Sequence, residues 1–216
     1  MRLYYTPFKG LIHKVQVVAI EKGVYDRLEP RCTVPYDRWE ELAGANPLSK
    51  VPTLVLDDGT PIYGGPAVYE FLDSLAPEPK LFPPSGKERY VDLTRLSLGD
   101  WIFDLSNQRT IERNRPVDHW RYAVFDRFDS AIWRAIDRID QDCVDYKGIT
   151  IGQISIACGL LYLDFQRRGG SFAEDWRPGR PQLQRWFEKI TARPSFVPRD
   201  DEVVERLTYP YKRPLN

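Results

Sequence analysis

Apolar residues in the first part of the chain alternate between the spacings of strands and of helices. Residues 2–5 form a short β-prone run, and apolar side chains then recur with a period near 3.6 residues over 11–19. Gly23 stands where a helix C-terminal cap is expected, and residues 25–30 suit a second strand. This pattern predicts a strand–helix–strand unit at the start of the chain.

The next segment contains a hairpin with strong turn chemistry. A short helix is expected over 36–44, and residues 53–56 and 61–63 are predicted strands joined by an Asp-Asp-Gly-Thr turn. From Pro66 onward apolar residues again recur at helical spacing, with the proline in the first turn, where its missing N–H is not needed. The predicted order of elements to residue 75 is therefore βαβ, then α, then ββα.

The strand signals end in a proline-rich segment at 76–85, which predicts a linker. We therefore expect an α/β domain at 1–75 and an all-helical domain at 86–216 that ends in a charged tail without helical period. Segment 150–165 is apolar nearly all round, so it should be the central buried helix of this second domain. The helical patterns cover 93–105, 124–139, 150–165 and 183–190.

Composition excludes several classes of function. The 31 basic residues balance 31 acidic ones, so no bulk field attracts nucleic acid or an anionic membrane, and no run of eighteen apolar residues indicates a membrane span. The three cysteines, Cys32, Cys143 and Cys158, are far apart, which disfavours a disulfide framework or a zinc site. With only two histidines, a metal centre is not expected, and the chain reads as cytoplasmic.

Residues 46–54, Asn-Pro-Leu-Ser-Lys-Val-Pro-Thr-Leu, with the Asp-Gly turn and the helix that follow, resemble the glutathione-binding half of the glutathione transferase family. The resemblance implies a thioredoxin-like N-terminal domain, with a cis peptide bond before Pro52. It implies that the backbone of Val51 pairs with the cysteinyl part of glutathione. It also places Lys50 where the family often contacts the glycine carboxylate of glutathione, with a solvated lysine beside the turn as the alternative.

Two further sequence segments resemble the same family. Residues 148–153, Gly-Ile-Thr-Ile-Gly-Gln, match the capping box and hydrophobic staple at the start of the family's central helix. Thr150 is expected to accept a hydrogen bond from the N–H of Gln153, whose side chain returns one to Thr150, while Ile149 packs against Ile154. Residues 186–196 resemble the helix after the central one and its proline-marked end, although a generic amphipathic helix would look the same.

The family's acidic residue and serine at the N-terminus of the helix after the hairpin are absent here. Those positions are Gly64 and Gly65, so the side chains that would hold the γ-glutamyl end of glutathione are missing, and only backbone N–H groups and the helix dipole remain. Losing two hydrogen bonds to charged groups could cost about 3 to 6 kcal/mol. The alternative is that the two glycines simply form a tight strand-to-helix turn.

The residue that stabilises the glutathione thiolate lies just after the first strand in this family. The usual serine position falls on Lys9, and no cysteine stands there, so thiol-exchange members of the family are poor models. Thr6 offers a hydroxyl three residues earlier and Tyr5 a phenol, while the charge of Lys9 could lower the pKa of the thiol. Thr6 is slightly favoured over Lys9, and both also have ordinary loop roles.

The leading hypothesis is a glutathione transferase that joins the thiol of glutathione, as co-substrate, to the alkyl or aryl group of an apolar electrophile. Residues 101–109 fall where the family's first bundle helix lines the electrophile pocket; Trp101, Phe103, Asp104 and Arg109 are candidates there, or core residues. A homodimer is expected from the resemblance. The rivals are a non-catalytic binding or scaffold protein of the same fold, and an enzyme that uses a different anionic ligand at the same helix terminus.

Overall fold

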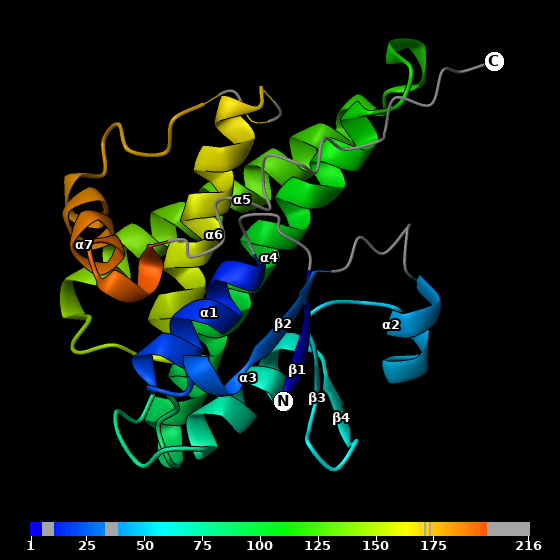
Figure 1. Ribbon diagram of the computed structural model, residues 1–216. Helices are drawn as coiled ribbons and strands as arrows, with labels where there is room; N and C mark the ends of the chain where they lie inside the picture. Colours follow the sequence, from blue (N-terminus) through cyan, green and yellow to red (C-terminus); the bar gives the residue numbers. More distant parts are fainter. Residues whose placement is uncertain (6–10, 33–38, 171, 173, 198–216) are drawn as a thin grey trace.

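A four-stranded mixed sheet forms the first part of the fold (Figure 1). Strand β1 (Arg2–Tyr5) pairs in parallel with β2 (Glu29–Cys32) and antiparallel with β3 (Thr53–Val55), which in turn pairs antiparallel with β4 (Pro61–Tyr63). The spatial order of the strands is therefore β2-β1-β3-β4. The computed structural model of the chain describes residues 1–5, 11–32, 39–170, 172 and 174–197.

Three helices cover the two faces of this sheet. Helices α1 (Leu11–Glu21) and α3 (Gly65–Ser74) lie on the face toward the second half of the chain, and α2 (Trp39–Ala45) lies on the other face (Figure 1). Side chains alternate along β1, so Leu3 packs into the core with α1 and α3, while Tyr4 packs with Leu42 of α2. The predicted βαβ-α-ββα order is confirmed for the first part of the chain.

The predicted second strand begins later than expected. Residues Tyr25–Arg27 form a 3₁₀ turn (η1), in which the N–H of Arg27 bonds to the carbonyl of Val24 at 3.1 Å. The N–H of Val24 itself bonds back to Ala19 at 2.8 Å and Gly23 has a φ of 66°, so the helix ends in a cap that turns the chain. The expectation of a strand over 25–30 is therefore wrong at its start, because these residues complete the turn before β2 pairs with β1.

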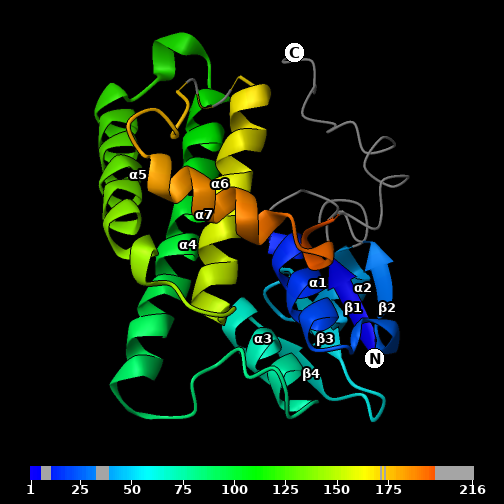
Figure 2. The same cartoon turned by 90° about the vertical axis from the view of Figure 1, so that its left-hand side faces the viewer.

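The second half of the described chain is helical. Helices α4 (Gly86–Arg113), α5 (Tyr122–Asp142) and α6 (Ile151–Arg168) run alongside one another, and α7 (Pro181–Thr191) crosses them (Figure 2). Helix α6 is buried over almost its whole length, which confirms the predicted central helix. Three short 3₁₀ helices, η2 (Val117–His119), η3 (Cys143–Asp145) and η4 (Pro194–Phe196), complete this part.

The start of α6 is held by the predicted cap and by an aspartate from α4. Thr150 Oγ1 accepts from the N–H of Gln153 at 3.4 Å and donates to Asp92 Oδ1 at 2.6 Å, while Asp92 Oδ2 accepts from the N–H of Gly152 at 3.1 Å. The Gln153 side chain donates to the carbonyl of Lys147 at 3.1 Å, so the expectation that it returns a bond to Thr150 needs correction. The N–H of Gly152, a second free donor at this helix N-terminus, is satisfied by Asp92, whose carboxylate comes from the neighbouring helix α4.

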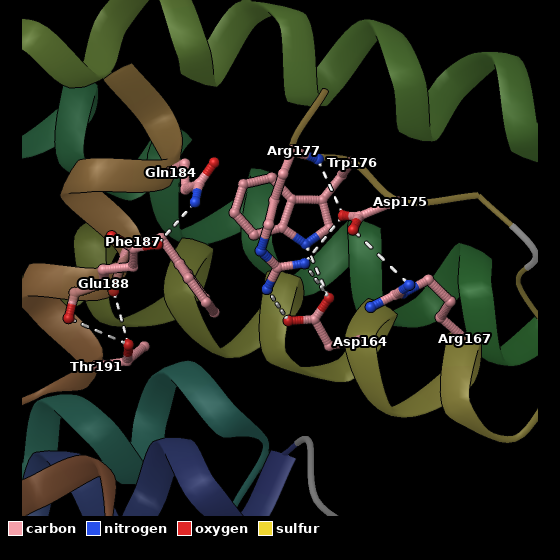
Figure 3. A network of polar contacts seen from close by, with 9 residues as sticks. All are labelled: Asp164, Arg167, Asp175, Trp176, Arg177, Gln184, Phe187, Glu188 and Thr191. Atoms are coloured by element: carbon pink, nitrogen blue, oxygen red, sulfur yellow. Dashed lines mark hydrogen bonds and ion pairs between the residues drawn. The ribbon is translucent and has the colours of Figure 1, made fainter. Parts of the chain in front are cut away.

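A partly buried ion pair joins the loop before α7 to α6 (Figure 3). Asp164 accepts hydrogen bonds from Arg177 Nη1 at 2.9 Å and Nη2 at 2.5 Å, and from Trp176 Nε1 at 3.1 Å. Asp175 Oδ1 accepts a hydrogen bond from the backbone N–H of Arg177 at 3.1 Å, and Asp175 Oδ2 lies 3.7 Å from Arg167 Nη1. The bidentate geometry fixes the loop that leads from α6 to α7.

Contacts between the two halves of the chain include a second bidentate pair. Arg193 donates to both oxygens of Glu21 at 2.7 Å, and Ser195 Oγ donates to Glu21 at 2.6 Å. Burial alone would raise the pKa of Glu21, but these hydrogen bonds outweigh it and hold the pKa below its ordinary value. The end of α1 is therefore tied to η4 at the far end of the described chain.

Candidate functional site

The loop between α2 and β3 carries three of the predicted binding residues and is organised by a buried asparagine. Asn46 is 2 % exposed, and its Nδ2 donates to the carbonyl of Lys50 and to Thr53 Oγ1, each at 3.0 Å. Its Oδ1 accepts from the N–H of Leu48 at 2.9 Å. Because one side chain bonds to both ends of the loop, it determines the path of the backbone through residues 48–53.

The peptide bond between Val51 and Pro52 is cis, as the resemblance implies. Pro52 is buried against the sheet, Val51 is half-buried and Lys50 is exposed. Val51 is therefore partly accessible to solvent, and the exposed Lys50 precedes it in the chain.

The β3–β4 hairpin brings this loop beside the first turn of α3. Thr53 at the start of β3 pairs with Tyr63 at the end of β4, so Pro52, just before Thr53, and Gly64, just after Tyr63, leave the sheet at the same end of this strand pair. The pairing therefore places the loop and the first turn of α3 at one end of the β3–β4 pair.

Local geometry accounts for both glycines at the start of α3. Gly64 has a φ of 88°, a conformation that side chains rarely adopt, and it caps the helix without a side-chain hydrogen bond. At Gly65 a Cβ atom would lie 2.7 Å from Tyr69 Oη and 3.0 Å from two ring carbons of Tyr69. The positive φ of the turn therefore favours glycine at position 64. At position 65 a side chain would clash with Tyr69, which fills the space next to the Gly65 backbone.

A buried polar cluster adjoins Tyr69. Lys14 of α1 is 1 % exposed, and its Nζ contacts Asp100 of α4, donates to Ser155 Oγ of α6 at 2.6 Å, and lies 5.5 Å from the centre of the Tyr69 ring. The sequence motifs did not reveal this cluster, although one signal was available. Lys14 interrupts the apolar face that Leu11, Val15 and Val18 predict, and a charge on such a face needs a partner.

Neither described cysteine side chain suits thiol chemistry. Burial raises the pKa of Cys158 to about 12, against the opposing effect of Lys14, and burial raises the pKa of Cys143 to about 11. Both thiols therefore stay protonated at neutral pH and serve as core residues.

The four candidates for the electrophile pocket point in different directions. The Phe103 ring lies 4.3 Å from that of Tyr162 on α6, whereas Arg109 donates to Asp129 of α5 at 2.6 Å. Trp101 is 60 % exposed, and Asp104 accepts from Gln108 on the same helix. Of the four, Phe103 alone faces α6 in the contacts described, so the structure does not bring these four residues together.

Both predicted thiol-activating residues, Thr6 and Lys9, lie outside the described residues. In sequence they stand between the end of β1 and the start of α1. Within the described part of the chain, no group of His, Cys, Asp and Glu side chains is arranged to hold a metal ion. No helix of that part is both long and apolar enough to cross a membrane.

Comparison with known sequences points to one family. The family model described as "Glutathione S-transferase, N-terminal domain" matches residues 12–75. A curated protein of Escherichia coli, the uncharacterized GST-like protein YibF, is 28% identical over 198 residues, which cover 90% of this chain and 94% of that protein.

Solved structures lead to the same family. A glutathione transferase family member from Pseudomonas fluorescens Pf-5 with bound glutathione has a TM-score of 0.80 and 29% identity, over 90% of this chain and 96% of that one. A glutathione S-transferase from Methylobacillus flagellatus with glutathione bound has a TM-score of 0.82 and 28% identity, over the same shares of the two chains.

Proposed function

Because the chain belongs to the glutathione S-transferase family, we propose that it binds glutathione as a co-substrate and joins its thiol to an apolar electrophile. One observation carries the proposal: the loop held by Asn46 and the N-terminus of α3 lie at the same end of the β3–β4 pair, so an exposed loop and a helix end that favours anions are close together. The two relatives with bound glutathione support it, since each matches 90% of this chain.

The proposed pose uses the three chemical groups of glutathione in order. The backbone of Val51 pairs with the cysteinyl part, the Lys50 ammonium meets the glycine carboxylate, and the γ-glutamyl carboxylate lies at the first turn of α3 beside Gly64 and Gly65. Each contact matches a donor to a charged or amide acceptor, and charge-assisted hydrogen bonds are the stronger kind.

Thiol activation is assigned to the segment after β1. The Thr6 hydroxyl donates a hydrogen bond to the glutathione sulfur and so lowers the pKa of the thiol, with Lys9 as the alternative through its positive charge. The thiol proton passes to solvent, and the thiolate sulfur forms a bond to the electrophilic carbon. The electron pair of the bond that breaks goes to the departing halide of an aryl halide, to the ring oxygen of an epoxide or to the nitrogen of an isothiocyanate. This chemistry needs activation and proximity more than an elaborate set of catalytic groups.

The electrophile is assigned to the helical half, on the side where the Phe103 and Tyr162 rings meet. We also assign the working form to a cytoplasmic homodimer. Trp101 and Tyr90, which is 71 % exposed, stand eleven residues apart on α4 and so share a helix face, and they support such an interface.

Turnover assays on single variants test the catalytic part. With an aryl halide, an epoxide and an isothiocyanate as electrophiles, Thr6→Ala should lower kcat at least tenfold while the Kd for glutathione changes little. If Lys9→Ala has this effect instead, the assignment passes to Lys9. Equal turnover in the wild type and both variants contradicts both assignments.

The absence of side chains at Gly64 and Gly65 favours a second candidate, a non-catalytic binding protein of the same fold. It predicts glutathione binding without turnover of any electrophile, or no glutathione binding at all. Calorimetry and the same electrophile panel therefore distinguish the two functions.

A further inference from the structure

The first turn of α3 has the properties of an anion site. The helix is ten residues long, Gly64 caps it without a side-chain bond, and Gly64, Pro66 and Ala67 are exposed. The first N–H groups of a helix lack intrahelical acceptors and carry a partial positive charge, which favours a carboxylate. Pro66 has no N–H, so this terminus offers one donor fewer than usual.

An unpaired buried hydroxyl lies directly against this turn. The Tyr69 side chain is 0 % exposed, and its hydroxyl has no hydrogen-bond partner among the described residues. It lies 2.7 Å from the point that a Cβ atom on Gly65 would occupy. A buried hydroxyl without a partner is destabilising, and this one lies beside a helix N-terminus, where a ligand carboxylate could accept its hydrogen bond.

The charged groups near Tyr69 are already paired with one another. Lys14 Nζ contacts Asp100 and Ser155, and it faces the ring of Tyr69 at 5.5 Å. The Lys14 charge is thus compensated within the cluster, and the hydroxyl of Tyr69 remains the spare donor next to the helix N-terminus.

We propose that the Tyr69 hydroxyl donates a hydrogen bond to the γ-glutamyl carboxylate of glutathione at the N-terminus of α3. This inference rests on the proposed function, which assigns that carboxylate to this turn. Tyr69 stands four residues after Gly65, and its side chain points back toward the helix N-terminus. Its hydroxyl therefore lies where a short side chain at position 65 would otherwise lie. Gly65 and Tyr69 therefore act as a pair, since the missing side chain makes room for the phenol.

Removing the hydroxyl oxygen of Tyr69 tests the inference. Tyr69→Phe keeps the ring and removes the hydroxyl, so the Kd for glutathione measured by calorimetry should rise roughly 10- to 150-fold, as for a lost hydrogen bond to a charged group. The melting temperature without ligand should stay unchanged or rise, because the hydroxyl has no partner in the fold. The same fold-loss is expected with γ-glutamylcysteine, which lacks the glycine but retains the γ-glutamyl carboxylate.

Tyr146→Phe is the matched control. Its hydroxyl is also buried, but it lies in the helical half, where the Tyr146 ring packs against Trp186 and Arg95. This variant should keep the wild-type Kd for glutathione.

Four outcomes overturn the inference, and they separate it from the proposed function. An unchanged Kd in Tyr69→Phe overturns the inference alone, provided that the wild type binds glutathione. A weaker Kd with a lower melting temperature shows a structural role for the hydroxyl, and a loss that vanishes with γ-glutamylcysteine assigns Tyr69 to the other end of the ligand. A wild type that does not bind glutathione overturns both.

Discussion

Replacing Asn46 with alanine tests how the candidate binding loop is held. The substitution removes three hydrogen bonds, to Lys50, Thr53 and Leu48. The carbonyl of Lys50 keeps one partner, since Thr53 Oγ1 also donates to it at 2.7 Å, and the Leu48 N–H can turn to water at the surface. At about 1 kcal/mol for each hydrogen bond, the variant should lose about 2 to 4 kcal/mol of unfolding free energy.

This loss should appear in two measurements. For a chain of this size about 1 kcal/mol corresponds to about 2 to 4 °C, so thermal denaturation should show a Tm lower by about 4 to 16 °C. Glutathione would then have to order the loop on binding. Ordering one residue costs about 1 to 2 kcal/mol, so the Kd from calorimetry should rise roughly tenfold or more.

Asn107→Ala is the control for the loss of an amide. Asn107 is half-buried on α4 and accepts one long hydrogen bond, from the Tyr162 hydroxyl at 3.4 Å. Its Tm should fall by less than that of Asn46→Ala, and its Kd for glutathione should not change. If Asn46→Ala keeps both the wild-type Tm and the wild-type Kd, the argument that Asn46 positions the loop is refuted.

Three further predictions concern the rest of the molecule. Asp164→Ala leaves the buried Trp176 N–H without its acceptor and Arg177 with Asp175 as its partner, so it should cost about 2 to 4 kcal/mol in urea unfolding with an unchanged Kd for glutathione, and equal stability would contradict this. Because the pKa of Glu21 is lowered in the folded protein, its ionised form stabilises the fold above the ordinary carboxyl pKa, and this stability is lost as the pH falls through the lowered pKa. Glu21→Gln should therefore make the free energy of unfolding less dependent on pH in the acid range, and an unchanged dependence would count against the Arg193 contact. Trp101→Glu should halve the mass found by light scattering if the exposed α4 face is the dimer interface, whereas a dimeric variant would exclude it.

Local chemistry made much of the fold predictable. The Asp-Gly turn and its flanking alternation are confirmed as the β3–β4 hairpin, and the Thr150 cap is confirmed at the start of α6. In each case the signal lies within a few neighbouring residues, where turn and cap geometry depend on the residues themselves.

Errors arose where distant residues decide the outcome. The strand predicted to start at residue 25 starts at Glu29, because pairing with β1 begins at Arg2 opposite Glu29. The partner of Thr150 at the α6 N-terminus is Asp92, which lies 58 residues earlier in the chain. No spacing rule connects such positions, since the contacts form only when α4 packs against α6.

In the candidate site, too, residues within a local motif could be predicted, whereas contacts between distant residues could not. The loop at Lys50–Pro52 and the glycines at 64 and 65 were predicted as binding residues from their motif, and the β3–β4 pairing puts the loop and the first turn of α3 at the same end of that strand pair. The Lys14, Tyr69, Asp100 and Ser155 cluster was missed because its members come from four separate helices, α1, α3, α4 and α6. The roles of Thr6 and Lys9 remain predictions.

Calorimetric titration of the wild-type protein with glutathione shows whether the chain binds this tripeptide. Binding should give saturable heat with one site per chain, together with a rise in Tm that grows with the glutathione concentration. The absence of both heat and thermal shift at 10 mM glutathione, roughly the upper limit expected for a site weakened by the two glycines, would contradict it.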